Sequence, residues 1–165
     1  TASLERLETM LSKNENINLH IIYLLRDIKA YSNSARKNSK INIKKAAKQW
    51  IKYQNLILYV LKLFPKKNIT IIRYENLCKN PENYFNYFQK HFDLNQGVKL
   101  PSNLKFSDNH IIGNRMRLKN PIQIKYNASW KNELSERDKK IIDDLSEKTR
   151  KKINQFEKSL KYNEI

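Results

Sequence analysis

Two arginines that follow apolar runs are the first candidates for chemistry in this sequence. Arg26 comes directly after residues 19–25, and Arg73 lies near the end of residues 69–74. A guanidinium presents a planar fork of donors that suits phosphate oxygens, which the ammonium of a lysine does not. Because arginines are scarce here relative to lysines, their positions at two strand ends indicate a bound anion. The alternative is a surface ion pair, with Asp27 or Glu75 as the partner of Arg26.

Ser34 is a second candidate because it follows Arg26 by eight residues. If a helix begins after Asp27, the Ser34 hydroxyl lies about two turns into it and could reach an anion that Arg26 holds. The N-terminus of that helix would add positive potential. Arginine, serine and helix end together predict a phosphate site.

The apolar runs that carry these residues are predicted to be strands. Residues 19–25 and 69–74 are apolar almost throughout and are bounded by polar turns, as in strands buried on both faces of a parallel sheet. Between them, residues 28–37 and 43–61 have helical periodicity, with Asp27 as the N-cap of the first helix. Pro65 ends the second helix.

The rest of the chain adds further helices and one long loop. We predict a short helix over residues 3–11, a helix beginning at Asn80-Pro81, and a last helix beginning at Ser135, which pairs with Asp138 in a capping box. Residues 95–127 lack periodicity and are predicted to be a long loop, of the kind that is usually functional or disordered. The order of elements predicts an α/β layer fold with a parallel sheet, and two strands make a poor sheet, so we expect more strands upstream.

Charge and cysteine content set weaker limits. The 165 residues include 33 Lys and Arg against 16 Asp and Glu, a formal charge of +17. Such a positive field attracts polyanions. Lysine, asparagine and isoleucine are all abundant, however, so a codon bias of the gene would also explain the excess of lysine. The charge alone therefore identifies no partner. The single cysteine, Cys78, fits a reducing compartment, and we expect a cytoplasmic protein. No apolar run is long enough for a membrane span, and the histidines and Cys78 lack metal-ligand spacing, so no metal is expected.

Residues 23–34 closely resemble the 3′-phosphate motif of sulfotransferases that use 3′-phosphoadenosine 5′-phosphosulfate (PAPS). That motif is an apolar strand, then R-D-P-R-A, then a serine eight residues after the arginine. Here the strand is followed by Arg26-Asp27, and Ser34 stands at the serine position. Ile28 replaces the usual proline, which affects the turn more than the phosphate contacts. The resemblance implies that Arg26 and Ser34 bind the 3′-phosphate of PAPS.

Two later segments resemble the same family, in its order. Residues 72–77, followed by residues 80–82, are similar to R-Y-E-D-L…D-P-E, whose tyrosine lies near the adenine, which implies that role for Tyr74. Residues 110–117, followed by Trp130 and Leu134, are similar to H-x-x-G-N-x-x-R…W-x-x-x-L of bacterial members. This implies a set of donor-binding residues, with Arg117 preferred to Arg115 by motif position: Gly113, Asn114, Arg115 and Arg117.

The resemblance implies a P-loop NTPase-like sulfotransferase fold, with residues 1–165 as the C-terminal part of one domain. A D-S-S-K element, the P-loop-type phosphosulfate loop, the catalytic lysine and the base are then expected upstream of residue 1, so no catalytic residue is assigned. The expected activity is transfer of a sulfuryl group from PAPS to a hydroxyl or amine, releasing 3′,5′-ADP (PAP). The acceptor is unknown, with a glycan or a lipid among the options.

Two other functions remain open from sequence. A basic nucleic-acid-binding module would use the charge of +17, but no nucleic-acid motif is visible, and we expect no nucleic-acid partner. A nucleotide kinase related to the P-loop architecture would bind ADP as well as 3′,5′-ADP. In that case the spacing from Arg26 to Ser34 would be a coincidence.

Overall fold

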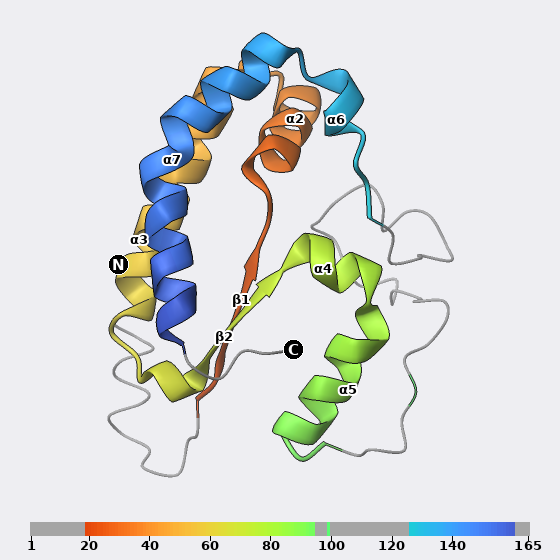
Figure 1. Ribbon diagram of the computed structural model, residues 1–165, viewed down its shortest axis with the longest axis vertical. Coiled ribbons are helices and arrows are strands. Elements are labelled where there is room, and N and C mark those ends of the chain that lie inside the picture. Colours follow the sequence, from red (N-terminus) through yellow and green to blue (C-terminus); the bar gives the residue numbers. More distant parts are fainter. Residues whose placement is uncertain (1–18, 95–98, 100–125, 161–165) are drawn as a thin grey trace.

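A small parallel sheet surrounded by helices forms the fold in the computed structural model, which describes residues 19–94, 99 and 126–160. The chain is α/β and mostly helical (Figure 1). The elements are β1 (Ile21–Leu25), α2 (Ile28–Ser39), α3 (Ile43–Leu61), the 3₁₀ helix η1 (Lys66–Asn68), β2 (Ile69–Arg73), α4 (Tyr74–Lys79), α5 (Pro81–His91), α6 (Trp130–Glu133) and α7 (Glu136–Ser159).

The two described strands pair in parallel. The register runs from Ile21 opposite Ile69 to Leu25 opposite Arg73. Parallel strands need a long crossover, which α2 and α3 provide: β1 leads up to α2, and α3 returns along the sheet to η1 (Figure 1). The predicted parallel α/β arrangement is confirmed at this level.

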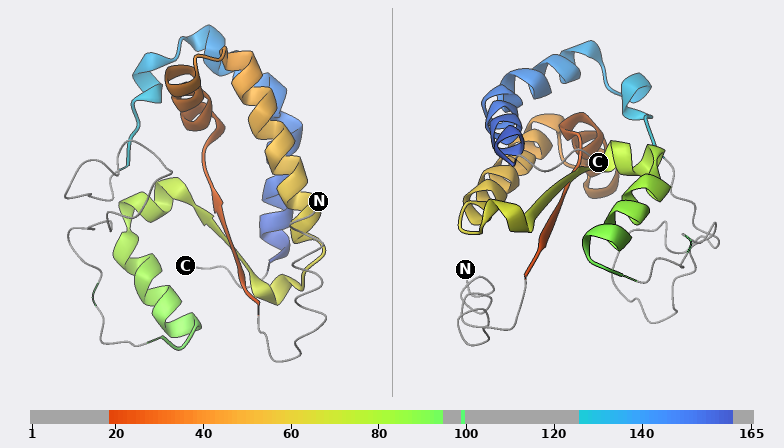
Figure 2. Two further views of the ribbon diagram at one scale, coloured as in Figure 1. Left: turned by 180° about the vertical axis from the view of Figure 1, so that it is seen from behind. Right: turned by 60° about the horizontal axis from the view of Figure 1, so that its bottom comes forward.

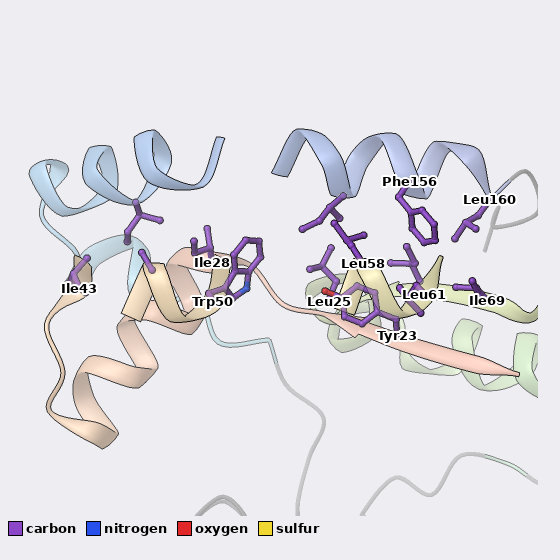
Figure 3. Close-up of a cluster of buried hydrophobic side chains, with 14 of the residues drawn as sticks. Tyr23, Leu25, Ile28, Ile43, Trp50, Leu58, Leu61, Ile69, Phe156 and Leu160 are labelled. Atoms are coloured by element: carbon purple, nitrogen blue, oxygen red, sulfur yellow. The ribbon is translucent and has the colours of Figure 1, made fainter. Parts of the chain in front are cut away.

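One face of the sheet is covered by α3 and α7, which lie side by side and run in the same direction (Figures 1 and 2). Alternate residues of each strand point into this layer, as the two-residue period requires. Figure 3 shows the side chains that meet there. The largest buried members from the sheet, α3 and α7 are Tyr23, Leu25, Ile69, Ile71, Trp50, Leu58, Leu61, Ile142, Ile153 and Phe156.

Side-chain caps begin the main helices. Asp27 accepts hydrogen bonds from the amides of Lys29 and Ala30 at the start of α2, and the Ser135 side chain accepts one from the Asp138 amide at the start of α7. Both predicted N-caps are therefore confirmed. Each cap satisfies amides that have no partner within the helix.

The other face of the sheet is covered unequally. Helix α5 lies on this side (Figure 2). His20, just before β1, places its Nε2 2.8 Å from the Thr70 hydroxyl. The centre of its ring lies 4.9 Å from the ring centres of His91 and Phe92. β2 is buried on both faces, as predicted. For β1 that prediction is wrong, because Ile22 and Leu24 are 47% and 48% exposed. The described elements cover this face over β2 but leave it open over β1.

Two of the helices in the structure were not predicted from sequence, and two of the predicted segments fall outside the described residues. β2 ends at Arg73 because Tyr74 begins the short helix α4, which was not predicted, and neither was α6. The predicted helix over residues 3–11 and nearly all of the predicted loop over residues 95–127 fall outside the described residues. None of the helices described is long and apolar enough to cross a membrane.

Replacing Ile142 with alanine should strongly destabilise the fold. Ile142 is 0% exposed and belongs to the hydrophobic core, so its truncation leaves a cavity that costs about 2–5 kcal/mol. Urea denaturation of Ile142→Ala measures this loss. Leu56→Ala, at a side chain that is 54% exposed, is the control and should change stability by less than ~0.5 kcal/mol. Equal losses in the two variants would contradict this core.

Acidification should destabilise the protein in part through His20. Burial, and then the nearby charge of His91, lower the pKa of His20 from its ordinary 6.5. As the pH falls, His20 is protonated more readily in the unfolded chain than in the folded one. The contribution of neutral His20 to the stability of the fold is therefore complete above about pH 6.5 and is lost as the pH falls further. His20→Gln should show a shallower fall in thermal midpoint than wild type between about pH 7 and pH 5. Parallel curves for the two proteins would refute this role.

Candidate functional site

A hollow of about 340 Å³ lies where β1 and β2 end. This is the edge at which open parallel sheets bind ligands. The residues that line it come from both strand ends, from the inner faces of α3 and α7, and from the segment around α6: Leu25, Arg26, Asp27, Ile28, Trp50, Arg73, Glu75, Asn76, Tyr126, Trp130, Arg150, Ile153 and Asn154.

Arg26 has an anchored backbone and an unpaired side chain. Its carbonyl oxygen accepts a hydrogen bond of 3.2 Å from Trp50 Nε1, while its guanidinium carbon lies 5.3 Å from the centre of the Tyr74 ring. Arg26 Nε is buried and has no hydrogen-bond partner among the described residues. A buried donor without a partner is uncommon in folded proteins and is satisfied in solution by a water molecule or by a ligand.

The carboxylates beside Arg26 are used by the backbone. Asp27 Oδ1 accepts from the amides of Lys29 at 2.7 Å and Ala30 at 3.1 Å, and Glu75 Oε1 accepts from the Asp27 amide at 3.0 Å. Neither forms an ion pair with Arg26 in the described part of the chain. The ion-pair alternative for Arg26 therefore lacks a partner there.

Arg73, the other strand-end arginine, is already paired. Its guanidinium forms a two-pronged ion pair with Glu157 of α7, and Nη2 also donates to Asn154 Oδ1 at 3.1 Å. The hydrogen bond to Glu157 raises the pKa of Arg73, and burial opposes this only in part. The two strand-end arginines thus differ: Arg73 links β2 to α7, whereas Arg26 Nε has no hydrogen-bond partner among the described residues.

A second unpaired donor borders the hollow at Trp130. Its Nε1 is buried and has no hydrogen-bond partner among the described residues, and Lys29 Nζ lies 5.8 Å from the centre of its ring. Asp143 of α7 lies 2.8 Å from Lys29 Nζ and 3.3 Å from Arg150 Nη2. Arg150 and Lys29 are therefore partly neutralised, and the remaining donor capacity lies on Arg26 and Trp130.

Tyr74 lies beside Arg26 but is not one of the residues that line the hollow. Burial, a hydrogen bond to Cys78 and the proximity of that thiol raise the pKa of Tyr74, and the charge of Arg26 opposes the rise. Tyr74 begins α4, one residue after the last paired residue of β2. The structure therefore brings Arg26 and Tyr74 together, while the adenine contact of Tyr74 stays a prediction.

Ser34 does not join them. It lies within α2 but does not line the hollow, and its hydroxyl accepts a hydrogen bond of 3.2 Å from Asn38 Nδ2. The buried side of α2 presents Ser32 and Asn33 instead, and the next residue is turned about 100° further around the helix. The other predicted donor-binding residues, which are Gly113, Asn114, Arg115 and Arg117, lie outside the described residues.

Sequence reasoning missed three contributors to the hollow. Trp50 lies in the helix that was predicted over residues 43–61, but its hydrogen bond to the Arg26 carbonyl depends on how α3 packs. Trp130 entered only as part of the family resemblance, and Arg150 was not singled out. The scarcity of arginine, which drew attention to Arg26, was the available signal for Arg150.

Comparisons with protein families, with curated proteins and with solved structures found no match to this chain. Among the described residues, no three His, Cys, Asp or Glu side chains gather as metal ligands. The geometry above is therefore the basis for any functional proposal.

The two strand-end arginines should differ in their effect on stability. Arg73→Met leaves Glu157 unpaired, and because these side chains are 42% and 28% exposed, we expect a loss of only about 1 kcal/mol. Arg26→Met keeps a contact with the Tyr74 ring and should change stability by less than ~0.5 kcal/mol. Urea denaturation of both variants tests this. A larger loss for Arg26→Met would show that Arg26 has a structural partner.

Proposed function

We propose that the hollow at the strand ends is part of the 3′-phosphate site of a PAPS-dependent sulfotransferase with a P-loop NTPase-like fold. The observation that carries the proposal is that Arg26 lines the hollow and that its buried Nε has no hydrogen-bond partner among the described residues. The guanidinium carbon lies 5.3 Å from the centre of the Tyr74 ring. A phosphate there would satisfy the buried Nε and would form charge-assisted hydrogen bonds, which are the stronger kind. The resemblance of residues 23–34 to the family motif supports this role independently.

The backbone around Arg26 favours an anion held by side chains. Asp27 occupies the amides of Lys29 and Ala30, and Glu75 occupies the amide of Asp27. P-loop kinases hold phosphates mainly with free backbone amides at a helix start. Here those amides are occupied, so an anion at this position would have to be held by side chains.

In the proposed reaction, the acceptor oxygen or nitrogen attacks the sulfur of PAPS. The bond from sulfur to the 5′-phosphate oxygen breaks, PAP leaves with the electron pair, and a base takes the acceptor proton. The proposal assigns Arg26 to the 3′-phosphate and Tyr74 to the adenine, with Gly113, Asn114, Arg115 and Arg117 as further donor-binding residues from the resemblance. The resemblance also implies Ser34, which lies outside the hollow in the structure. These residues position the donor, and the proposal names no base among them.

Calorimetric binding of 3′,5′-ADP, ADP and 5′-AMP at moderate salt tests the proposal. Wild type should prefer 3′,5′-ADP, and Arg26→Ala should weaken that binding by roughly 10- to 100-fold, because it removes charge-assisted hydrogen bonds. Arg137→Ala, at an exposed arginine in the first turn of α7, changes the net charge equally and should bind like wild type.

Each other outcome has a distinct meaning. Equal affinity of wild type and Arg26→Ala for 3′,5′-ADP refutes the assignment of Arg26. Equal affinity of wild type for ADP and 3′,5′-ADP supports a nucleotide kinase instead. Similar affinities for 3′,5′-ADP, ADP and 5′-AMP, all of which fall steeply as the salt concentration rises, indicate a basic nucleic-acid-binding module.

A further inference from the structure

The outer face of α3 and the turn after it expose a stripe of large apolar side chains. Tyr53, Leu56, Tyr59 and Leu63 are 46%, 54%, 64% and 63% exposed. Their spacing of three or four residues places them along one side of a helix. The opposite side of α3 carries Trp50, Leu58 and Leu61, which belong to the core. We call the four exposed residues the outer stripe.

Lysines border the outer stripe. Residues 43–68 contain seven lysines and no aspartate or glutamate. Lys52, Lys62, Lys66 and Lys67 are exposed, and none of them forms an ion pair with another described residue. Lys152 of α7 adds a further positive charge, because it lines the same shallow groove as Tyr59 and Lys62.

An anionic lipid bilayer matches both properties of this surface. Leucines can enter the boundary between headgroups and acyl chains, tyrosines prefer the headgroup level, and lysines attract anionic headgroups. A nucleic acid would pair with the lysines but leave Leu56 and Leu63 in water. A protein partner would cover the leucines but would need acidic residues for each unpaired lysine.

We propose that the outer stripe and its lysines seat the protein on the surface of an anionic bilayer, with α3 lying along the membrane plane. The hollow at the strand ends stays accessible, because Trp50, its lining residue on α3, lies on the opposite side of that helix. The proposal does not depend on the nucleotide chemistry. It concerns binding to a membrane surface, and it is tested independently of 3′,5′-ADP binding.

Cosedimentation of the full chain with phosphatidylcholine vesicles, with and without phosphatidylglycerol, tests the proposal. Wild type should bind only the anionic vesicles. The double variant Leu56→Ser, Leu63→Ser should bind them at least roughly 10-fold more weakly, since burying one leucine contributes about tenfold or more to an equilibrium constant. The double variant Lys62→Glu, Lys66→Glu should also bind more weakly, and added salt should reduce wild-type binding.

A matched control separates this face from net charge. Lys90→Glu with Lys131→Glu changes the charge equally at exposed positions of α5 and α6, away from α3 (Figure 1), and should bind like wild type. Unchanged thermal midpoints would show that each variant folds.

Three results would overturn the proposal. If the serine variant binds anionic vesicles like wild type, the leucines do not insert and adsorption is only electrostatic. If the control loses as much binding as Lys62→Glu with Lys66→Glu, no particular face is involved. If wild type ignores vesicles but forms a dimer that the serine variant loses, as measured by analytical ultracentrifugation, the stripe is an interface between two copies.

Discussion

The parallel pairing of β1 with β2 is the constraint on which the candidate site depends. Because Leu25 lies opposite Arg73 in this register, the strands end together, and Arg26 can reach the ring of Tyr74. A parallel pair also requires a long crossover, and here that crossover includes α3, whose Trp50 hydrogen bonds to the Arg26 carbonyl. Without this pairing, nothing in the described structure would bring Arg26, Tyr74 and Trp50 into contact.

The distribution of charge around the strand ends decides which groups remain available. Helix α7 supplies the carboxylates that neutralise Arg73 and Arg150, namely Glu157 and Asp143. The carboxylates nearest to Arg26 are instead held by backbone amides. A guanidinium that is already paired has few donors available for an anion, whereas a buried donor without a partner, such as Arg26 Nε among the described residues, carries a desolvation cost that a ligand could remove. The same packing that stabilises the fold thus concentrates donor capacity at Arg26.

Helix α3 connects two surfaces of different character. Its inner side lies in the core and reaches the hollow through Trp50, while its outer side combines exposed apolar residues with unpaired lysines. The excess positive charge is uneven along the chain: residues 28–74 contain twelve lysines and arginines and no acidic residue. Most of the net charge of +17 is therefore contributed by α2, α3, η1 and β2 and the turns between them.

Local features were predictable from sequence: the helical periods of α2, α3 and α7, the caps Asp27 and Ser135, and two parallel strands. These depend on residues a few positions apart. Coverage of the outer face of β1 and the position of Ser34 relative to Arg26 were not predictable in this way. Sequence alone noted an arginine at each strand end and, through the spacing to Ser34 and the family resemblance, favoured Arg26 as the phosphate ligand. Only the tertiary structure showed that Arg73 is already paired, because Glu157 lies 84 residues further along the chain and is brought there by the packing of α7.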